Sequence, residues 1–271
     1  MDLLQRNHQL LLKGINCTFL RYLHARIEWE DRLIGIFGSR GVGKTTLLLQ
    51  HIKLKFEDSR EALYVNLDDF WFETHSLTDA VKEFLQAGGH YLFLDEIHFY
   101  SGWMEEVSTL LDANPALKIV FATTSLYSQT EVRNGLRHEA AFYTMHPMSF
   151  REFLSYESIL DKDPIPLEDI LANHHDLVKE INAEMNIVPI YRNYLEHGCY
   201  PFYWQDPDMY YLTNQHAPKV GNIKDVSKES IAYDTGLGIP IAIFPNTCTV
   251  GYTDLGETDR SFTEVLFSGP D

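Results

Sequence analysis

The segment from Gly38 to Thr45 constrains the fold of this chain more than any other feature of the sequence. Its residues are Gly-Ser-Arg-Gly-Val-Gly-Lys-Thr, which match the pattern GxxxxGK[ST] without a gap. An apolar segment, residues 32–37, precedes it, and a helical pattern, residues 45–56, follows it. Glycines let the backbone wrap closely around an anion, and the amino end of the following helix adds partial positive charge. The segment therefore predicts a phosphate-binding loop between a strand and a helix.

Apolar segments alternate with helical patterns through the first 150 residues. After a helix within residues 1–30, we expect strands over residues 32–37, 62–67, 91–94 and 117–122, and helices over residues 45–56, 77–86 and 103–111. Strands of continuous apolar character are typical of a parallel sheet that is covered on both faces. The expected fold class is α/β, with a parallel-sheet P-loop NTPase core.

The pattern changes after this core. We expect residues 1–148 to form the P-loop core and residues 149–212 to form a helical lid subdomain, with helices over residues 149–156, 166–185 and 188–198. Residues 213–271 form a short C-terminal appendage without an assignment. They hold 6 of the 16 glycines and 4 of the 11 prolines, together with short apolar runs such as residues 239–244. This composition predicts strands and turns.

The residue types of the loop suit a nucleotide with its metal ion. We expect the backbone amides from Gly41 to Thr45 to converge on the β-phosphate, and Lys44 to reach the β- and γ-phosphates. The Thr45 hydroxyl is a ligand for Mg²⁺, and Thr46 approaches the α-phosphate. The expected cofactors are ATP and Mg²⁺, and the expected nucleotide-binding residues are Gly38, Ser39, Arg40, Gly41, Val42, Gly43, Lys44, Thr45 and Thr46.

An acidic pair, Asp95 and Glu96, follows the apolar segment 91–94. A buried strand that ends in an acidic residue delivers a carboxylate beside the metal. We expect Asp95 to hold Mg²⁺ through water, beside Thr45, and Glu96 to orient the attacking water or accept its proton; the alternative is a pair that only ends the strand. The chain has no Asn-Lys-x-Asp guanine motif, and a small-molecule kinase needs no such glutamate. ATP hydrolysis is therefore favoured over GTPase and kinase activity.

Hydrolysis also requires groups that contact the γ-phosphate. Thr-Thr-Ser at residues 123–125 follows the segment 117–122. We expect the Thr124 hydroxyl to contact the γ-phosphate or the attacking water. Ordinary strand-end capping is the alternative. Arg133 and Arg137 follow, and each is a candidate arginine finger, in cis or across an oligomer interface. Arg137 is the expected catalytic residue of the two, and a solvated surface arginine is the alternative for both.

Several motifs together resemble one known family. They are the phosphate loop, Leu-Asp-Glu-Ile-His at residues 94–98 with Trp103 after it, Thr-Thr-Ser, Pro-Met-Ser-Phe-Arg-Glu-Phe-Leu at residues 147–154, Tyr194-Leu195, and Gly-Cys-Tyr-Pro-Phe at residues 198–202. Over roughly residues 15–211 the chain resembles the prokaryotic AAA+-type P-loop ATPases, the uncharacterised ATP-binding proteins whose longer members carry a C-terminal domain of unknown function. The resemblance implies ATP binding, Mg²⁺ dependence and ATPase activity, and it supports Lys44, Thr45, Asp95 and Glu96.

The chain departs from this family in two places. The family usually shows Gly-Ser-Ser at the sensor strand and Gly-Arg after it, where this chain has Thr-Thr-Ser and Gly135-Leu136-Arg137. After about residue 211 the chain no longer follows the family pattern, so we expect a truncated or divergent end.

The charge of the chain limits its partners. Its 271 residues include 22 Lys and Arg against 39 Asp and Glu, a net charge of −17. This acidity disfavours a protein that coats nucleic acid or an anionic membrane. Residues 1–60 differ, with 10 Lys and Arg against 6 Asp and Glu, so positive charge gathers where the nucleotide binds. The sequence has no signal-peptide pattern and no apolar run that would span a bilayer, and we expect a cytoplasmic protein without a membrane partner.

Two functions remain open. The first is a Mg²⁺-dependent ATPase whose cycle changes the conformation of the lid and so acts on an unidentified protein or nucleic-acid partner, with a homo-oligomer expected from the family resemblance. The second is a nucleotide-gated signalling or scaffold module that binds ATP with little turnover. Glu96 favours the first. His98 follows the two carboxylates and either lines the pocket or packs behind it.

Overall fold

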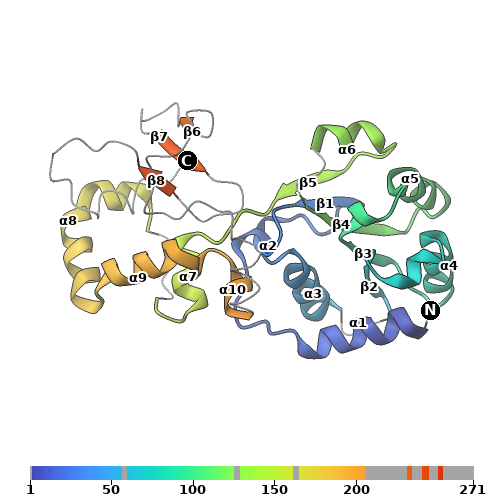
Figure 1. Ribbon diagram of the computed structural model, residues 1–271, viewed down its shortest axis with the longest axis horizontal. Coiled ribbons are helices and arrows are strands. Elements are labelled where there is room, and N and C mark those ends of the chain that lie inside the picture. Colours follow the sequence, from blue (N-terminus) through green and yellow to red (C-terminus); the bar gives the residue numbers. More distant parts are fainter. Residues whose placement is uncertain are drawn as a thin grey trace. The chain divides into compact units, whose positions relative to one another are not determined.

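The computed structural model describes residues 2–56, 60–124, 129–160 and 165–205, together with three short strands within residues 231–252. The chain divides into two compact units, Met1–Pro147 and Met148–Asp271 (Figure 1). Within the described residues, no helix has the length and apolar character that would let it cross a membrane.

A five-stranded sheet forms the centre of the first unit. All of its strand pairs are parallel, and their order across the sheet is β2-β3-β4-β1-β5. The strands are β1 (Leu33–Phe37), β2 (Ala62–Asn66), β3 (Tyr91–Asp95), β4 (Lys118–Thr123) and β5 (Ala141–Thr144). The first four are almost wholly buried, because they are covered on both faces. The expected α/β class and parallel P-loop core are therefore confirmed.

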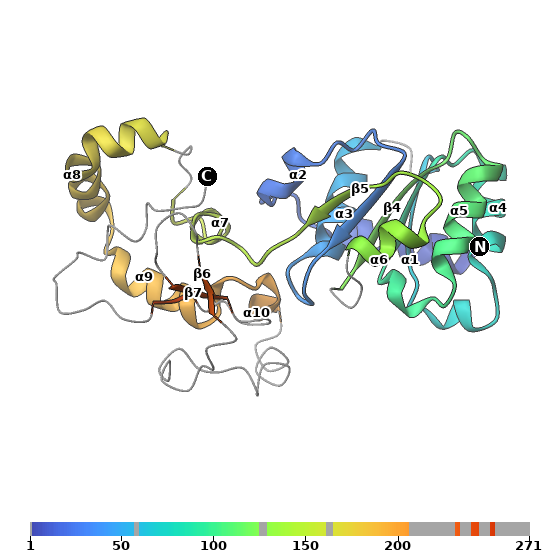
Figure 2. The ribbon, with the colours of Figure 1, turned by 90° about the horizontal axis from the view of Figure 1, so that it is seen from above.

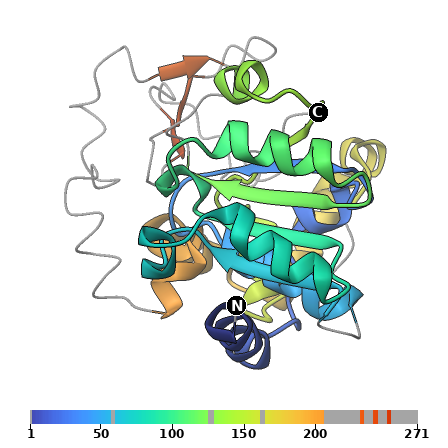
Figure 3. The ribbon, with the colours of Figure 1, turned by 90° about the vertical axis from the view of Figure 1, so that its right-hand side faces the viewer.

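Helices cover both faces of this sheet (Figure 3). On one face, α4 (Leu77–Gln86) and α5 (Trp103–Ala113) join a single apolar core with side chains such as Leu92 and Phe121. On the other face, α3 (Lys44–Lys55) packs near Phe93, whose side chain points away from that of Leu92 because successive strand residues alternate. The helix α1 (Asp2–Gly14) lies against α3 and the edge strand β2.

The structure adds elements that the sequence patterns did not predict. These are the strand β5, the helix α6 (Gln129–Gly135), the short helix α2 (Tyr22–Arg26), and the 3₁₀ turns η1 (Phe70–Glu73) and η2 (Ile97–Phe99). β5 is a four-residue edge strand and only half-buried, and its apolar residues are fewer than those of the central strand β4. α6 lies near it (Figure 2). The Arg133 guanidinium of α6 lies 5.0 Å from the centre of the Phe142 ring of β5.

The described residues 148–160 and 165–205 of the second unit are mainly helical. They contain α7 (Phe150–Tyr156), α8 (Leu167–Glu184), α9 (Ile187–Asn193), the π-helical turn η3 (Tyr194–Gly198) and α10 (Pro201–Gln205). A capping box of Ser149 and Glu152 begins α7. The Phe150 ring lies 5.2 Å from that of Tyr194, whose hydroxyl donates to the Met148 carbonyl at 2.8 Å.

Later in the second unit, three described strands form an antiparallel sheet. They are β6 (Ile231–Tyr233), β7 (Pro240–Ile243) and β8 (Val250–Tyr252), in that order across the sheet. They fall within residues 213–271, where the composition predicts strands and turns. The other residues of that segment lie outside the described part of the chain.

Candidate nucleotide site

The phosphate loop connects β1 to α3. Gly41 and Gly43 have φ angles of 82° and 100°, in the region that favours glycine over residues with a side chain. At Gly38 a Cβ atom would lie 2.5 Å from the Met145 carbonyl oxygen, so the loop packs closely against the segment that follows β5. α3 begins directly at Lys44, with Gly43 as its N-cap. The glycines are therefore needed for the shape of the loop as well as for the approach of a ligand.

Arg21 holds this loop from outside the motif. Its guanidinium is buried, and it donates from Nη1 to the Val42 carbonyl at 2.6 Å and from Nη2 to the His146 carbonyl at 2.7 Å. A guanidinium can serve two acceptors at once because its N–H groups form a rigid planar fork. Sequence analysis missed this residue, since no local pattern distinguishes a buried arginine from a surface one.

The Lys44 side chain folds back over the loop. Its Nζ donates to the Gly38 carbonyl at 2.9 Å and to the Ser39 carbonyl at 3.0 Å, and the residue is only 5% exposed. Burial lowers the pKa of Lys44, while the charges of Glu96 and Asp95 oppose that shift. The ammonium group is thus kept at the loop, where a phosphate oxygen can replace a carbonyl as its acceptor.

Asp95 is bonded to the loop through Thr45. Its buried Oδ2 accepts from the Thr45 hydroxyl at 2.5 Å and from the Tyr64 hydroxyl at 2.8 Å, and its Oδ1 accepts from the Glu96 N–H at 3.0 Å. Burial, and then the negative charge of Asp95, raise the pKa of Tyr64, so the phenol remains a donor. A hydroxyl and a carboxylate are the hard oxygen ligands that Mg²⁺ prefers, and Mg²⁺ in phosphate sites takes its other ligands from the phosphates and water. These residues therefore fit the ion.

Glu96 has an unusual backbone and an unusual carboxylate. Its φ of 50° and ψ of 41° fall in the left-handed region, which costs energy for a residue with a side chain. Its Oε2 is buried and accepts no hydrogen bond from the described residues, although His98 Nδ1 lies 3.4 Å away. Burial, and then the charge of Asp95, raise the pKa of Glu96, against the opposing charges of Lys44 and Arg40. A strained, desolvated carboxylate with a raised pKa is typical of a general base.

The strand order brings the end of β4 between the loop and the acidic pair. β4 pairs with β1 on one side, with Thr123 opposite Phe37, and with β3 on the other. The Gly38 N–H donates to the Thr123 carbonyl at 3.3 Å. The Thr124 hydroxyl lies 3.5 Å from His98 Nε2. The structure therefore places Thr124 next to the acidic segment, whereas Ser125 lies outside the described residues.

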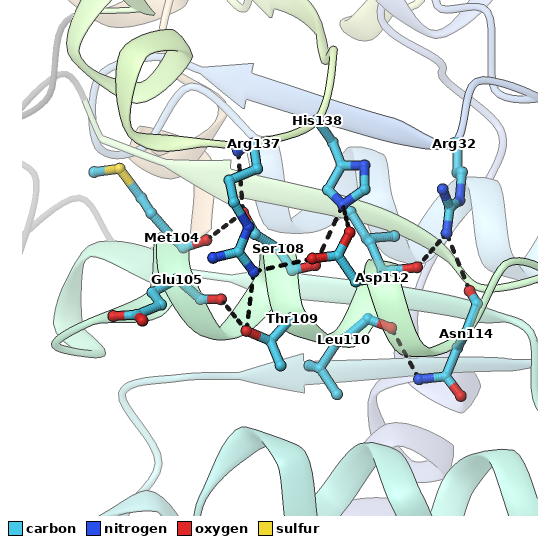
Figure 4. A network of polar contacts seen from close by, with 11 residues as sticks. Arg32, Met104, Glu105, Ser108, Thr109, Leu110, Asp112, Asn114, Arg137 and His138 are labelled. Carbon is cyan, nitrogen blue, oxygen red and sulfur yellow. Dashed lines mark hydrogen bonds and ion pairs between the residues drawn. The ribbon is translucent and has the colours of Figure 1, made fainter.

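The two candidate arginine fingers make contacts away from the loop. The Arg137 guanidinium donates to Thr109 Oγ1 at 3.1 Å and to Asp112 Oδ2 at 3.0 Å, both on α5 (Figure 4). Arg133 lies over the Phe142 ring. Within this chain, the described contacts of these two arginines involve α5 and β5, and no contact with the phosphate loop is among them. Their catalytic role stays a prediction.

The remaining loop residues differ in exposure. Arg40 is exposed, and its charge acts on the pKa values of both Lys44 and Glu96. Val42 is fully buried, and Thr46 is half-buried at the start of α3. The structure thus brings together the loop, the acidic pair and Thr124, and it adds two residues that sequence analysis did not assign to the site, Arg21 and Tyr64. His98, for which the sequence left pocket lining or packing open, lies in direct reach of Glu96.

Comparison with known proteins agrees with this geometry. Residues 30–154 match the model of a family described as "AAA domain". This match and the parallel sheet around the loop support a P-loop AAA-type ATPase domain. No curated protein matches the chain.

Two solved structures that match this chain are a Walker-type ATPase, PABY2304 of Pyrococcus abyssi, and PCH-2 of C. elegans. The first is 15% identical with a TM-score of 0.41, over 73% of this chain and 68% of the other. The second is 15% identical with a TM-score of 0.33, over 61% of this chain and 48% of PCH-2, so this chain matches about half of that protein.

Proposed function

We propose that this protein is a Mg²⁺-dependent ATPase. The observation that supports it most is the hydrogen bond between Thr45 and Asp95, which joins the phosphate loop to the end of β3, with Glu96 next to it. The three groups that hydrolysis needs are a phosphate cradle, a pair of metal ligands and a base. Here they come from one loop and one strand end.

In this proposal the loop binds the phosphates of ATP. The backbone amides from Gly41 to Thr45 and the amino end of α3 bind the β-phosphate, and Thr46 contacts the α-phosphate. Lys44 exchanges its bonds with the Gly38 and Ser39 carbonyls for phosphate oxygens. Thr45 and Asp95 would hold Mg²⁺, which when bound neutralises charge that develops on the phosphates.

Glu96 acts on the attacking water. The water oxygen forms a bond to the γ-phosphorus, and the bond from that phosphorus to the β,γ-bridging oxygen breaks, with its electron pair leaving on ADP. The Glu96 carboxylate accepts a proton from the water and returns it to solvent. The raised pKa of Glu96 makes it a better proton acceptor than an ordinary exposed carboxylate.

We further propose that the nucleotide cycle moves the helical lid, residues 149–212, and so acts on a protein or nucleic-acid partner. The lid helices belong to a separate compact unit, which is the property that a moving part requires. A homo-oligomer would let Arg137 or Arg133 of one copy reach the nucleotide of another.

Steady-state ATP hydrolysis by three forms of the full chain tests the catalytic proposal. Wild type should hydrolyse ATP with Mg²⁺, and Glu96→Gln should lower kcat about 100-fold or more while ATP still binds. Lys44→Ala should lose both binding and hydrolysis, because the loop loses its cation. If wild type binds ATP but hydrolyses it no faster than Lys44→Ala, the protein is the nucleotide-gated module instead.

A further inference from the structure

His98 connects the acidic pair to the end of β4. It lies in η2, and its side chain is only 7% exposed. Its Nδ1 lies 3.4 Å from Glu96 Oε2 and 3.4 Å from Thr123 Oγ1, and its Nε2 lies 3.5 Å from Thr124 Oγ1. The Phe99 ring packs on the imidazole, with 4.3 Å between the ring centres. One ring therefore reaches the proposed base, the last residue of β4, Thr123, and the residue after it, Thr124.

The neighbours of Nδ1 decide where the ring proton lies. In its proposed role as a base Glu96 is ionised, and an ionised carboxylate can only accept hydrogen bonds. The Thr123 hydroxyl donates its hydrogen to the Thr124 carbonyl at 3.1 Å, so it too offers lone pairs to the ring. Two acceptors facing one ring nitrogen require a hydrogen on that nitrogen.

The hydrogen-bonding role of the other ring nitrogen, Nε2, follows from the position of this hydrogen. Burial lowers the pKa of His98, so the imidazole is neutral at pH 7 and carries one hydrogen. With that hydrogen on Nδ1, Nε2 is an acceptor, and the group that faces it is the Thr124 hydroxyl, a donor. The buried Glu96 Oε2 accepts no hydrogen bond from the described residues, and the Nδ1–H is the donor within reach. Long contacts of this kind in a ligand-free site shorten when the substrate binds.

We propose that His98 is a positioning residue that orients the Glu96 carboxylate through its Nδ1–H, and that Thr124 sets the required tautomer by donating to Nε2. The inference rests on the proposed ATPase function. It gives Thr124 a role through the imidazole, instead of direct contact with the γ-phosphate. With Oε2 held by His98, Oε1 is the oxygen left to take the proton of the attacking water.

Kinetics of the full chain test the positioning role. His98→Ala should lower kcat about 10- to 100-fold, as loss of an orienting partner does, with the KM for ATP unchanged within about twofold. His98→Gln should recover part of that loss, because an amide offers one donor and one acceptor. Thr124→Val should lower kcat in the same direction by a smaller factor.

Double variants separate an effect of His98 through Glu96 from a general structural effect of the substitution. In the Glu96→Gln background, His98→Ala should add less than about a twofold loss, because the group it orients is no longer a base. In the His98→Ala background, Thr124→Val should add no loss. Full additivity in the first pair overturns the role of His98, and full additivity in the second shows that Thr124 contacts the nucleotide directly, which overturns its proposed role.

A spectroscopic measurement does not depend on turnover. The ¹⁵N shifts of the His98 ring, assigned by their disappearance in His98→Gln, should show the hydrogen on Nδ1 in the nucleotide-free protein. A hydrogen on Nε2 overturns the inference while leaving the ATPase proposal intact. If wild type hydrolyses no faster than Lys44→Ala, the ATPase proposal fails, and the catalytic role of His98 fails with it.

Discussion

The roles of individual residues near the nucleotide depend on partners that lie far from them in the sequence. Asp95 accepts three hydrogen bonds, and one of them comes from Tyr64, which is 31 residues away on β2. Fixed donors hold a buried carboxylate in one orientation, which is a property that a metal ligand needs. Tyr64 therefore contributes to the site although it belongs to neither motif.

Removal of the Tyr64 hydroxyl should weaken Mg²⁺ binding. In Tyr64→Phe, Asp95 Oδ2 loses one donor, so we expect a several-fold rise in the Mg²⁺ concentration needed for half-maximal ATP hydrolysis and a loss of stability of about 1–3 kcal/mol. The measurements are ATPase rate against Mg²⁺ concentration, and urea unfolding. Tyr143→Phe is the matched control, since its hydroxyl only accepts from the Glu28 N–H. An equal Mg²⁺ shift in both variants would contradict the role of Tyr64.

Among the elements, α1 has a defined task at the edge of the sheet. β2 is an edge strand, and such strands leave unpaired backbone groups. His8 of α1 is buried, and its Nδ1 accepts from the Tyr64 N–H at 3.0 Å. Asn7 Nδ2 donates to Asp69 Oδ2 at 3.1 Å, beyond the end of the same strand. The helix thus protects the strand that also provides Tyr64 to the proposed metal site.

The buried His8 side chain makes the free energy of unfolding depend on pH. Burial lowers the pKa of His8 from 6.5 to about 4. Between these pH values the unfolded chain binds a proton and the folded chain does not, so the free energy of unfolding should decrease by about 1.4 kcal/mol for each pH unit below 6.5. His8→Asn keeps an acceptor but does not titrate, so its stability should decrease less. Urea unfolding at pH 7 and pH 5 measures the difference, and equal losses in both proteins would refute it.

The strands and the site residues differ in how far the sequence alone predicts them. β1 to β4 are almost wholly buried, and their residues form apolar runs that are visible in the sequence, whereas β5 at the edge is short and only half-buried. Lys44, Thr45, Asp95 and Glu96 lie in short motifs whose chemistry is local. Arg21 and Tyr64 reach the site only through the packing of the chain, because their bonds to Val42 and Asp95 have no signature in the local sequence. His98 is visible in the motif after Glu96, but its contacts with Thr123 and Thr124 depend on the strand order.

On the scale of the whole molecule, the segment that leaves the first unit runs beside the phosphate loop. The Met145 N–H donates to the Phe37 carbonyl at 2.6 Å, and its carbonyl lies against Gly38. Arg21 joins the Val42 and His146 carbonyls. A shift of the loop on nucleotide binding would therefore act directly on the backbone that continues into Met148 and α7. This contiguous set of contacts supports the proposed coupling of the nucleotide to the lid.

Hydrogen exchange can test that coupling in the full chain. With Mg²⁺ and a non-hydrolysable ATP analogue, amide exchange should change in α7 and α9 as well as in the phosphate loop, because in the proposed cycle the lid responds to the nucleotide. Lys44→Ala should abolish both changes. Arg21→Lys keeps the charge but loses the two-point contact, so it should retain the change in the loop and reduce the change in α7. Exchange that changes only within residues 1–147 of wild type would refute lid coupling, because nucleotide binding would then leave the second unit unaffected.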